Sequence, residues 1–351
     1  MNEKNPAEKT TNEKNPAEVT ASLSQGVAFR RGRLLVNGKD ATMPLILSLV
    51  VIALVIIANP LTNGVFFTSN NLTNIMRQIP TIPGLLSLGM LMVILTGGID
   101  LSVGSVVGFS AILAATATVH WGLPVWLSFL LGIASGAFWG LTSGFIVARF
   151  KLAPFVVTLA MMTFIRGLTY VLSEQSINTG SFGFPEFSAL GSAMFLGIPV
   201  PALIMVIFFI IGAIFLNLTP LGRSTIAIGG NRETVRLAGI SVPRGIITAY
   251  VISGICSGTG GVLLASRLGN VQPSLGGTFE LDAIAACVIG GANLAGGKGT
   301  IQGTAMGVLI LAVMNNLLSL RNVDTYWQWV LKGVIIIAVV MIHSISQKRG
   351  K

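Results

Sequence analysis

Long apolar runs separated by short polar segments make up most of the chain, from about residue 43 to residue 345. A helix needs about 20 mostly apolar residues to cross the hydrocarbon core of a bilayer. The pattern therefore predicts an all-α integral membrane protein with about ten transmembrane helices. The predicted spans are the ranges 43–58, 79–96, 101–119, 124–148, 153–173, 195–217, 245–268, 281–294, 300–320 and 330–345, of which the first and eighth are short.

Composition excludes a soluble domain. Hydrophobic residues make up 52% of the 351 positions and charged residues only 10%, with a mean hydropathy of +0.81. A soluble protein with so large an apolar core would need a charged surface that these residues do not supply. Rows of glycine recur every four residues, at Gly132, Gly136, Gly140 and Gly144, at Gly254 and Gly258, and at Gly299, Gly303 and Gly307. Such rows predict helix faces that pack closely on other helices.

The lysines and arginines predict how the spans are oriented. If the N-terminus is cytoplasmic, 17 of the 22 basic residues fall on the cytoplasmic side, as the positive-inside rule requires. Both termini are then cytoplasmic, with the transmembrane domain at residues 43–346 and a short tail at 347–351. The N-terminal tail, residues 1–42, is polar, contains NEKNPAE twice and is expected to be disordered. Because these signals account for the net charge of +10, no nucleic-acid partner is expected.

One polar stretch, Pro220–Arg244, interrupts the apolar runs, and the span count places it in a cytoplasmic loop of about residues 218–244. Asn231 is suited to cap a helix of about two turns, Arg232 to Ala238, which Gly239 can end. A short, basic, capped helix on a loop is a surface that a partner can contact. The hypothesis is that this loop passes force from a partner to a membrane channel; the alternative is a solvated loop whose arginines only hold the topology.

Two sides of the predicted helix differ in chemistry. Arg232 and Arg236 lie four residues apart and can offer charges to one side, while Val235 and Ala238 can offer small apolar contacts to the other. The two glycines before the helix, Gly229 and Gly230, are expected to free the backbone.

The chain lacks the sequence motifs of an enzyme. Residues 292–299 come nearest to a Walker A motif but lack its first glycine and its hydroxyl residue, so no ATP hydrolysis by this chain is predicted. No cysteine or serine has a nearby histidine, and His120 and His343 stand alone, so neither a nucleophile nor a metal site is predicted. A membrane-embedded enzyme is therefore a weak alternative. An ion-coupled secondary carrier is a second one, disfavoured because only Asp100 and Asp282 approach the deep carboxylates that coupling needs.

Two ionisable residues stand within apolar sequence on both sides. Asp100 and Arg166 are candidates to face a cavity, although a charge pair or a helix cap explains each equally well. Two short segments of the chain are also similar to each other: Leu95–Gly104 (LTGGIDLSVG) and Val288–Gly297 (VIGGANLAGG). Glycine-rich breaks at corresponding points of two halves expose backbone polar groups to a midplane cavity in many transporters.

Four segments together resemble a known family. They are GGIDLSVGS at Gly97–Ser105, FVVTLAMMTFIRGL at Phe155–Leu168, AIGGNRETVRLAGI at Ala227–Ile240 and ELDAIAACVIGGANLAGGKGTIQG at Glu280–Gly303. They look like the ribose-type permeases of bacterial ATP-binding-cassette (ABC) sugar importers, and the likeness runs from about residue 44 to residue 345.

The resemblance implies the ABC importer permease fold: ten transmembrane helices per subunit in a homodimer of the bacterial inner membrane. It implies three partners, namely a cytoplasmic ATPase with two cassettes often fused in one chain, a periplasmic or lipid-anchored sugar-binding protein, and a second copy of this chain. No cofactor is expected in this chain, and ATP and Mg would be used by the ATPase. Ribose is the first substrate expected, with xylose, galactose, inositol or a furanose signalling sugar as alternatives.

The resemblance also assigns residues. It places Gly229, Gly230, Asn231, Ala238, Gly239 and Ile240 on the loop that meets the ATPase, and the charges of the predicted helix add Arg232 and Arg236 to these coupling residues. A path for neutral sugars needs amides and hydroxyls more than charges, so four amides of the last third are candidates beside Asp100 and Arg166, although amides also bridge helices. These amides are Asn293, Gln302, Asn315 and Asn316.

Overall fold

A computed structural model describes residues 38–180 and 184–349. The chain divides into two compact units, Met1–Ala41 and Thr42–Lys351, and the second is described below. The predicted disordered tail lies outside the described residues except for its last five, 38–42, which are helical. The predicted C-terminal tail likewise begins inside a helix that continues to Arg349.

The described chain is mostly helical, and each predicted span overlaps at least one helix. In chain order the elements are α2 (Gly38–Leu61), η1 (Val65–Phe67), α3 (Ser69–Gln78), η2 (Pro80–Leu85), α4 (Leu86–Leu95), α5 (Val103–Val119), α6 (Val125–Phe150), α7 (Pro154–Leu172), β1 (Ile177–Asn178), α8 (Pro185–Ser192), β2 (Met194–Phe195), β3 (Ile198–Pro199), α9 (Val200–Leu218), α10 (Pro220–Gly230), α11 (Arg232–Leu237), α12 (Val242–Leu268), β4 (Asn270–Val271), α13 (Phe279–Ile289), α14 (Ile301–Leu320) and α15 (Thr325–Arg349).

Six helical segments within the described residues are long and apolar enough to cross a membrane. They are Ser69–Leu95, α6, α7, α9, α12 and α14. Helix α13 has only 11 residues, about 17 Å of helix, which is roughly half the thickness of the hydrocarbon core. The all-α membrane fold is thus confirmed, whereas the count of ten spans stays a prediction.

Helix α4 forms the centre of the packing. All ten of its residues are buried, and it follows an irregular turn in which Ile82 is extended between Pro80 and Pro83. Because proline cannot continue the hydrogen-bond ladder of a helix, this pair of prolines separates α4 from α3. Helix α12 packs against α4, α5 and α6, and it is also largely buried.

Glycine rows set the closest helix contacts, as the sequence predicted. A Cβ atom at Gly136 would overlap the carbonyl oxygen of Gly254, and one at Gly140 would overlap that of Tyr250, so α6 and α12 touch through their backbones. Gly303 faces Gly290 in the same way, which brings α14 against the end of α13. The missing side chains let these backbones approach.

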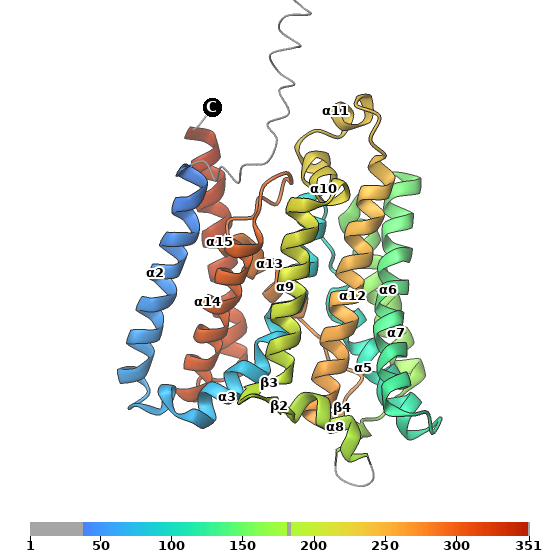
Figure 1. Cartoon of the computed structure of the whole chain (residues 1–351), viewed down its shortest axis with the longest axis vertical. Coiled ribbons are helices and arrows are strands. Elements are labelled where there is room, and N and C mark those ends of the chain that lie inside the picture. Colours follow the sequence, from blue (N-terminus) through green and yellow to red (C-terminus); the bar gives the residue numbers. More distant parts are fainter. Residues whose placement is uncertain (1–37, 181–183, 350–351) are drawn as a thin grey trace, which may run out of the picture. The chain divides into compact units, whose positions relative to one another are not determined.

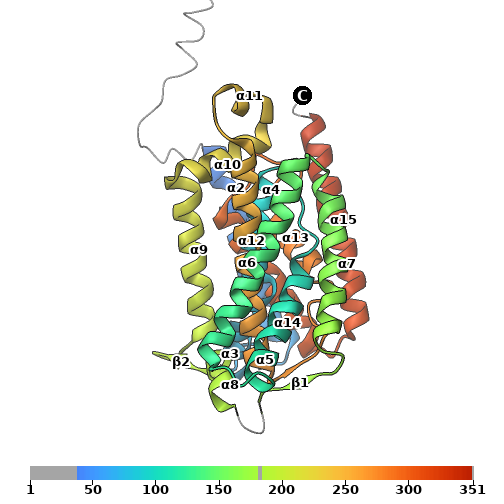
Figure 2. The ribbon, with the colours of Figure 1, turned by 90° about the vertical axis from the view of Figure 1, so that its right-hand side faces the viewer.

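The elements separate into two ends. Helices α10 and α11 lie at one end, and α8 with the short strands lies at the other (Figure 1). At the second end β1 pairs antiparallel with β4, and β2 with β3. The apolar pattern did not predict these strands, since each has only two residues and buries little surface. The junction of α6 with α7 lies at the same end as α10 (Figure 2), and it carries Arg149 and Lys151.

Candidate functional site

The polar stretch forms two helices that project beyond the bundle. Helix α10 precedes α11, and Asn231 caps α11: its side-chain oxygen accepts hydrogen bonds from the backbone amides of Glu233 at 3.0 Å and Thr234 at 3.1 Å. Gly239 follows the helix with a φ of 77°, a conformation that favours glycine. The short capped helix is where the sequence predicted it, because capping residues act locally.

Gly229 and Gly230 do not loosen the backbone, contrary to the prediction, because both belong to α10. Gly229 is instead needed because other backbone segments approach it too closely for a side chain to fit. A Cβ atom there would overlap the carbonyl oxygen of Leu95 and the backbone of Gly296 and Gly297. A Cβ atom at Gly230 would meet nothing within 4 Å. The two adjacent glycines therefore differ: one is packed and the other is open.

The end of α10 meets the two glycine-rich segments that echo each other in the sequence. The amide of Gly297 donates to the carbonyl oxygen of Leu95 at 3.1 Å, and Gly97 packs on the backbone of Ala295. Arg232 joins them, since its Nη2 donates to the carbonyl oxygen of Thr96 at 3.2 Å. We call this contact of α10 with residues 95–97 and 295–297 the glycine junction. It links the polar stretch to the ends of α4 and α13.

The outward side of α11 differs from the predicted one. Val235 is buried against Ile228 and Tyr250, so it holds α11 to the bundle. Leu237 is instead 76% exposed, and Ile240 is 43% exposed. Leu237 follows Val235 by two residues, about 200° around the helix, so the burial of one aims the other outward. The sequence spacing predicts that Leu237 faces outward only if Val235 is already known to be buried.

The charges of α11 are partly paired with each other. Arg236 forms an exposed ion pair with Glu233, three residues before it. The Arg236 guanidinium lowers the pKa of the Glu233 carboxyl, and the carboxylate in turn raises the pKa of Arg236. Arg236 and Arg232 therefore do not form one charged face, because Arg232 points to Thr96.

Asp100 serves as a buried acceptor inside the helix packing. Its carboxylate accepts from the amide and hydroxyl of Ser102 at 3.0 and 2.6 Å, and from the hydroxyl of Ser253 at 2.9 Å. Only 3% of the residue is exposed. These bonds tie the start of α5 to α12, so the helix-cap reading fits Asp100 better than a contact with a solute.

The amide candidates occupy separate places. Asn293 shapes the loop before α14, accepting from the amide of Ala295 at 3.0 Å. Gln302 is exposed on a groove of about 300 Å³ between α9 and α14 whose other lining residues are apolar. Neither residue lies in a pocket with the other candidates among the described cavities.

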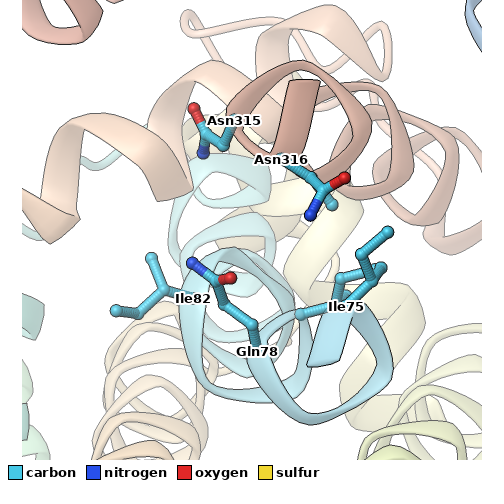
Figure 3. A pocket seen from close by; sticks show the side chains of 7 residues that line it. Ile75, Gln78, Ile82, Asn315 and Asn316 are labelled. Carbon is cyan, nitrogen blue, oxygen red and sulfur yellow. The ribbon is translucent and has the colours of Figure 1, made fainter. Parts of the chain in front are cut away.

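Asn315 and Asn316 line a small pocket together with Gln78 and Ile82 (Figure 3). Asn316 and Asn71 exchange two amide hydrogen bonds, of 2.8 and 3.1 Å, which bridge α14 and α3. The pocket holds roughly one water molecule and is too small for a sugar. In this structure Asn316 fits the helix-bridging alternative, whereas the buried Oδ1 of Asn315 has no hydrogen-bond partner among the described residues.

Arg166 is the remaining candidate. Its Nη1 donates to the carbonyl oxygens of Pro273, at 3.2 Å, and Leu275. The six candidate path residues therefore lie in several separate places and do not form one site in the described chain.

The helical segments that can cross a membrane and the buried polar contacts between them define a multi-pass membrane protein. Residues 71–340 match the model of the family described as "Branched-chain amino acid transport system / permease component". The chain belongs to this family.

Curated relatives carry narrower names. The chain is 44% identical over 292 residues to the ribose import permease protein RbsC of Bacillus subtilis, covering 82% of this chain and 89% of the relative. It is 39% identical to RbsC of Haemophilus influenzae, covering 89% and 94%, and 33% identical to the xylose transport system permease protein XylH of Escherichia coli, covering 86% and 91%. No solved structure matches the chain. The resemblance to ribose-type ABC permeases is confirmed, and the chain is a multi-pass protein of the bacterial inner membrane with a role in transport.

Proposed function

We propose that this chain is the membrane-spanning subunit of an ABC importer that admits a monosaccharide, with ribose as the first substrate. The observation that carries the proposal is the similarity over most of the chain to two permeases named for ribose and one named for xylose. Galactose, inositol and furanose signalling sugars remain alternatives. Family membership implies an ATPase and a sugar-binding protein as partners.

In the proposed assembly the ATPase docks on α10 and α11. Leu237 and Ile240 would enter an apolar hollow of the partner, since both are exposed at the outermost helix. Arg236, with Glu233, would supply charges at the rim. The glycine junction supports this assignment, because a displacement of α10 would reach α4 and α13 without an intervening flexible side chain.

The rest of the assembly follows the family pattern. Ten spans per subunit, cytoplasmic termini and a homodimer around a central path are proposed. ATP and Mg would be bound by the ATPase, whose two cassettes are proposed to be fused in one chain. The sugar-binding protein would dock at the opposite end, which carries α8 and the short strands. Asp100, Arg166, Asn293, Gln302, Asn315 and Asn316 are retained as path candidates.

Uptake into proteoliposomes tests the proposal. Purified chain is reconstituted with its ATPase, and radiolabelled ribose is supplied with the binding protein. Uptake is expected only with ATP, and vanadate is expected to abolish it. Uptake by this chain alone, driven by a proton or sodium gradient and unaffected by vanadate, would identify the alternative, an ion-coupled secondary sugar transporter.

A further inference from the structure

Residues 272–278 form an irregular segment that lies deep in the bundle. It connects β4 with α13 and packs on α5, where a Cβ atom at Gly104 would overlap the carbonyl oxygen of Gly276, and one at Gly108 that of Leu275. Gly108 lies about three turns before the end of α5 at Val119, roughly 17 Å along the helix. Since the hydrocarbon core is about 30 Å thick, the segment reaches its middle.

Irregular backbone at this depth needs polar partners. Carbonyl groups in hydrocarbon are costly unless they are hydrogen-bonded, so such segments occur where protein buries them or where they line a water-filled cavity. Arg166 on α7 supplies two of the bonds, to the carbonyl oxygens of Pro273 and Leu275. An arginine is thus used to hold this segment in place.

Buried and exposed side chains alternate at the start of the segment. Val271 and Pro273 are buried, while Gln272 and Ser274 between and after them are exposed. Exposed amide and hydroxyl groups within the membrane would lose their hydrogen bonds against lipid. The alternation therefore indicates water, and not lipid, on the exposed side.

Charged residues continue the same surface onto α13. Asp282 and Lys332 of α15 form an ion pair with 2.8 Å between Oδ1 and Nζ, and the side chains are only 6% and 15% exposed. Glu280 is partly buried and interacts electrostatically with Arg166. Among the described residues no side chain donates a hydrogen bond to Glu280, and its carboxylate accepts from its own backbone amide. Its carboxylate therefore retains free acceptor capacity.

The elements that carry these residues share one side of the bundle. Helices α7 and α15 both lie at the edge opposite α9 in Figure 2, whereas Figure 1 separates them laterally. Between them, α13 contacts α15 and α5 contacts α7. The surface between α7 and α15 is thus formed by α5, α13 and the irregular segment.

We propose that this surface is a wall of the sugar path, and that Glu280, Ser274 and Gln272 bind the hydroxyl groups of the passing monosaccharide. The inference rests on the proposed transport of a sugar and names residues for it. A carboxylate accepts from two hydroxyls at once, an amide donates and accepts, and a serine hydroxyl does both. Asp282 and Lys332 neutralise each other and hold α13 to α15, so they position Glu280 and do not contact the sugar.

Thiol accessibility tests the water-filled wall without any transport. Ser274→Cys and the control Ile207→Cys, which is 53% exposed on α9, are compared in proteoliposomes with a cationic methanethiosulfonate added to both sides. The two native cysteines are buried, so the unsubstituted protein sets the background. Because only a thiolate in water reacts, Ser274→Cys is expected to be labelled and Ile207→Cys to stay at background. Equal labelling of the two variants would refute the proposal that Ser274 faces a water-filled path.

Transport kinetics of the assembled importer test Glu280. Glu280→Gln keeps the shape but loses the charge, and the unsubstituted importer is the control. The maximum rate of ATP-driven ribose uptake is expected to fall about ten-fold in Glu280→Gln, the effect of one or two weakened charge-assisted hydrogen bonds. The KM for the loaded binding protein and the basal ATP hydrolysis should match those of the control. A maximum rate equal to that of the unsubstituted importer would refute the role of Glu280.

The two proposals fail in different ways. Suppose that the unsubstituted importer takes up sugar with ATP, but Ser274→Cys stays unlabelled and Glu280→Gln transports normally. The proposal that these residues line the sugar path is then wrong, and the importer assignment stands. If ATP drives no uptake while Ser274→Cys is labelled, the importer assignment is wrong and the water-filled wall stands.

Discussion

The backbone amide of Gly297 donates a hydrogen bond of 3.1 Å to the carbonyl oxygen of Leu95. This bond joins the loop after α13 to the last residue of α4, two helices far apart in the sequence. Gly229 of α10 packs on both segments. The outermost helices of the chain therefore rest on the ends of two inner ones, and a side chain at this point would separate them.

Gly229→Ala tests the packing of the glycine junction. The added methyl group would overlap the Leu95 carbonyl oxygen, and the cost is expected to be about 1–3 kcal/mol even though alanine favours a helix. Thermal unfolding in detergent and ATP-driven uptake should both fall. Gly230→Ala is the control, because nothing lies within 4 Å of its Cβ position. Equal stability of the two variants would contradict the close contact.

Asn231→Ala tests the cap of α11. Removal of the acceptor for the amides of Glu233 and Thr234 should destabilise the helix by about 0.5–2 kcal/mol. Faster amide hydrogen exchange in residues 232–237 would report it. Asn231→Asp retains an acceptor oxygen, so its amide hydrogen exchange should match that of the unsubstituted protein. An unchanged exchange rate in Asn231→Ala would show that the Asn231 cap does not stabilise α11.

Leu237→Asp tests the proposed docking surface. A carboxylate at this exposed apolar position should weaken association with the ATPase, because burying an unpaired charge is costly. The yield of co-purified ATPase is the measurement, and membrane insertion should be unaffected. Leu196→Asp makes the same substitution at a leucine that is 87% exposed between β2 and β3, at the other end of the bundle, and should co-purify normally. Co-purification that is equal in both variants would place the docking surface elsewhere.

Gly140→Val tests the contact between α6 and α12. Its side chain would collide with the backbone of Tyr250 and Gly254, with an expected loss of about 3 kcal/mol. Gly167→Val on α7 carries the same helix-propensity cost, but its Cβ position is open. The melting temperature of Gly140→Val should therefore drop well below that of Gly167→Val, and coincident melting curves would argue against backbone contact.

Cysteines at the two ends test the orientation in the membrane. In the chain expressed without its ATPase, Gly230→Cys should react with an impermeant thiol reagent only from the cytoplasm. Leu196→Cys, at a position that is 87% exposed between β2 and β3, should react only from outside. The opposite labelling of both variants would invert the predicted topology.

Features that depend on local chemistry could be predicted from the amino-acid sequence. Apolar run length predicted the helices, and the capping residues predicted α11, with Asn231 before it and Gly239 after it. The four-residue spacing of glycines predicted close contacts, because a missing side chain has the same effect wherever its helix packs. Shared motifs predicted the family, which the relatives confirm.

The partners that these features contact depend instead on how the helices pack in three dimensions. The rotation of α11 buries Val235 and exposes Leu237, and the fold pairs Asp100 with Ser253, more than 150 residues away. The four amide candidates lie in separate places, which the sequence could not show. Residue type indicates that a side chain can hydrogen-bond, but its partner depends on which helix lies beside it. The depth of residues 272–278 followed from their contact with α5, which no local pattern encodes.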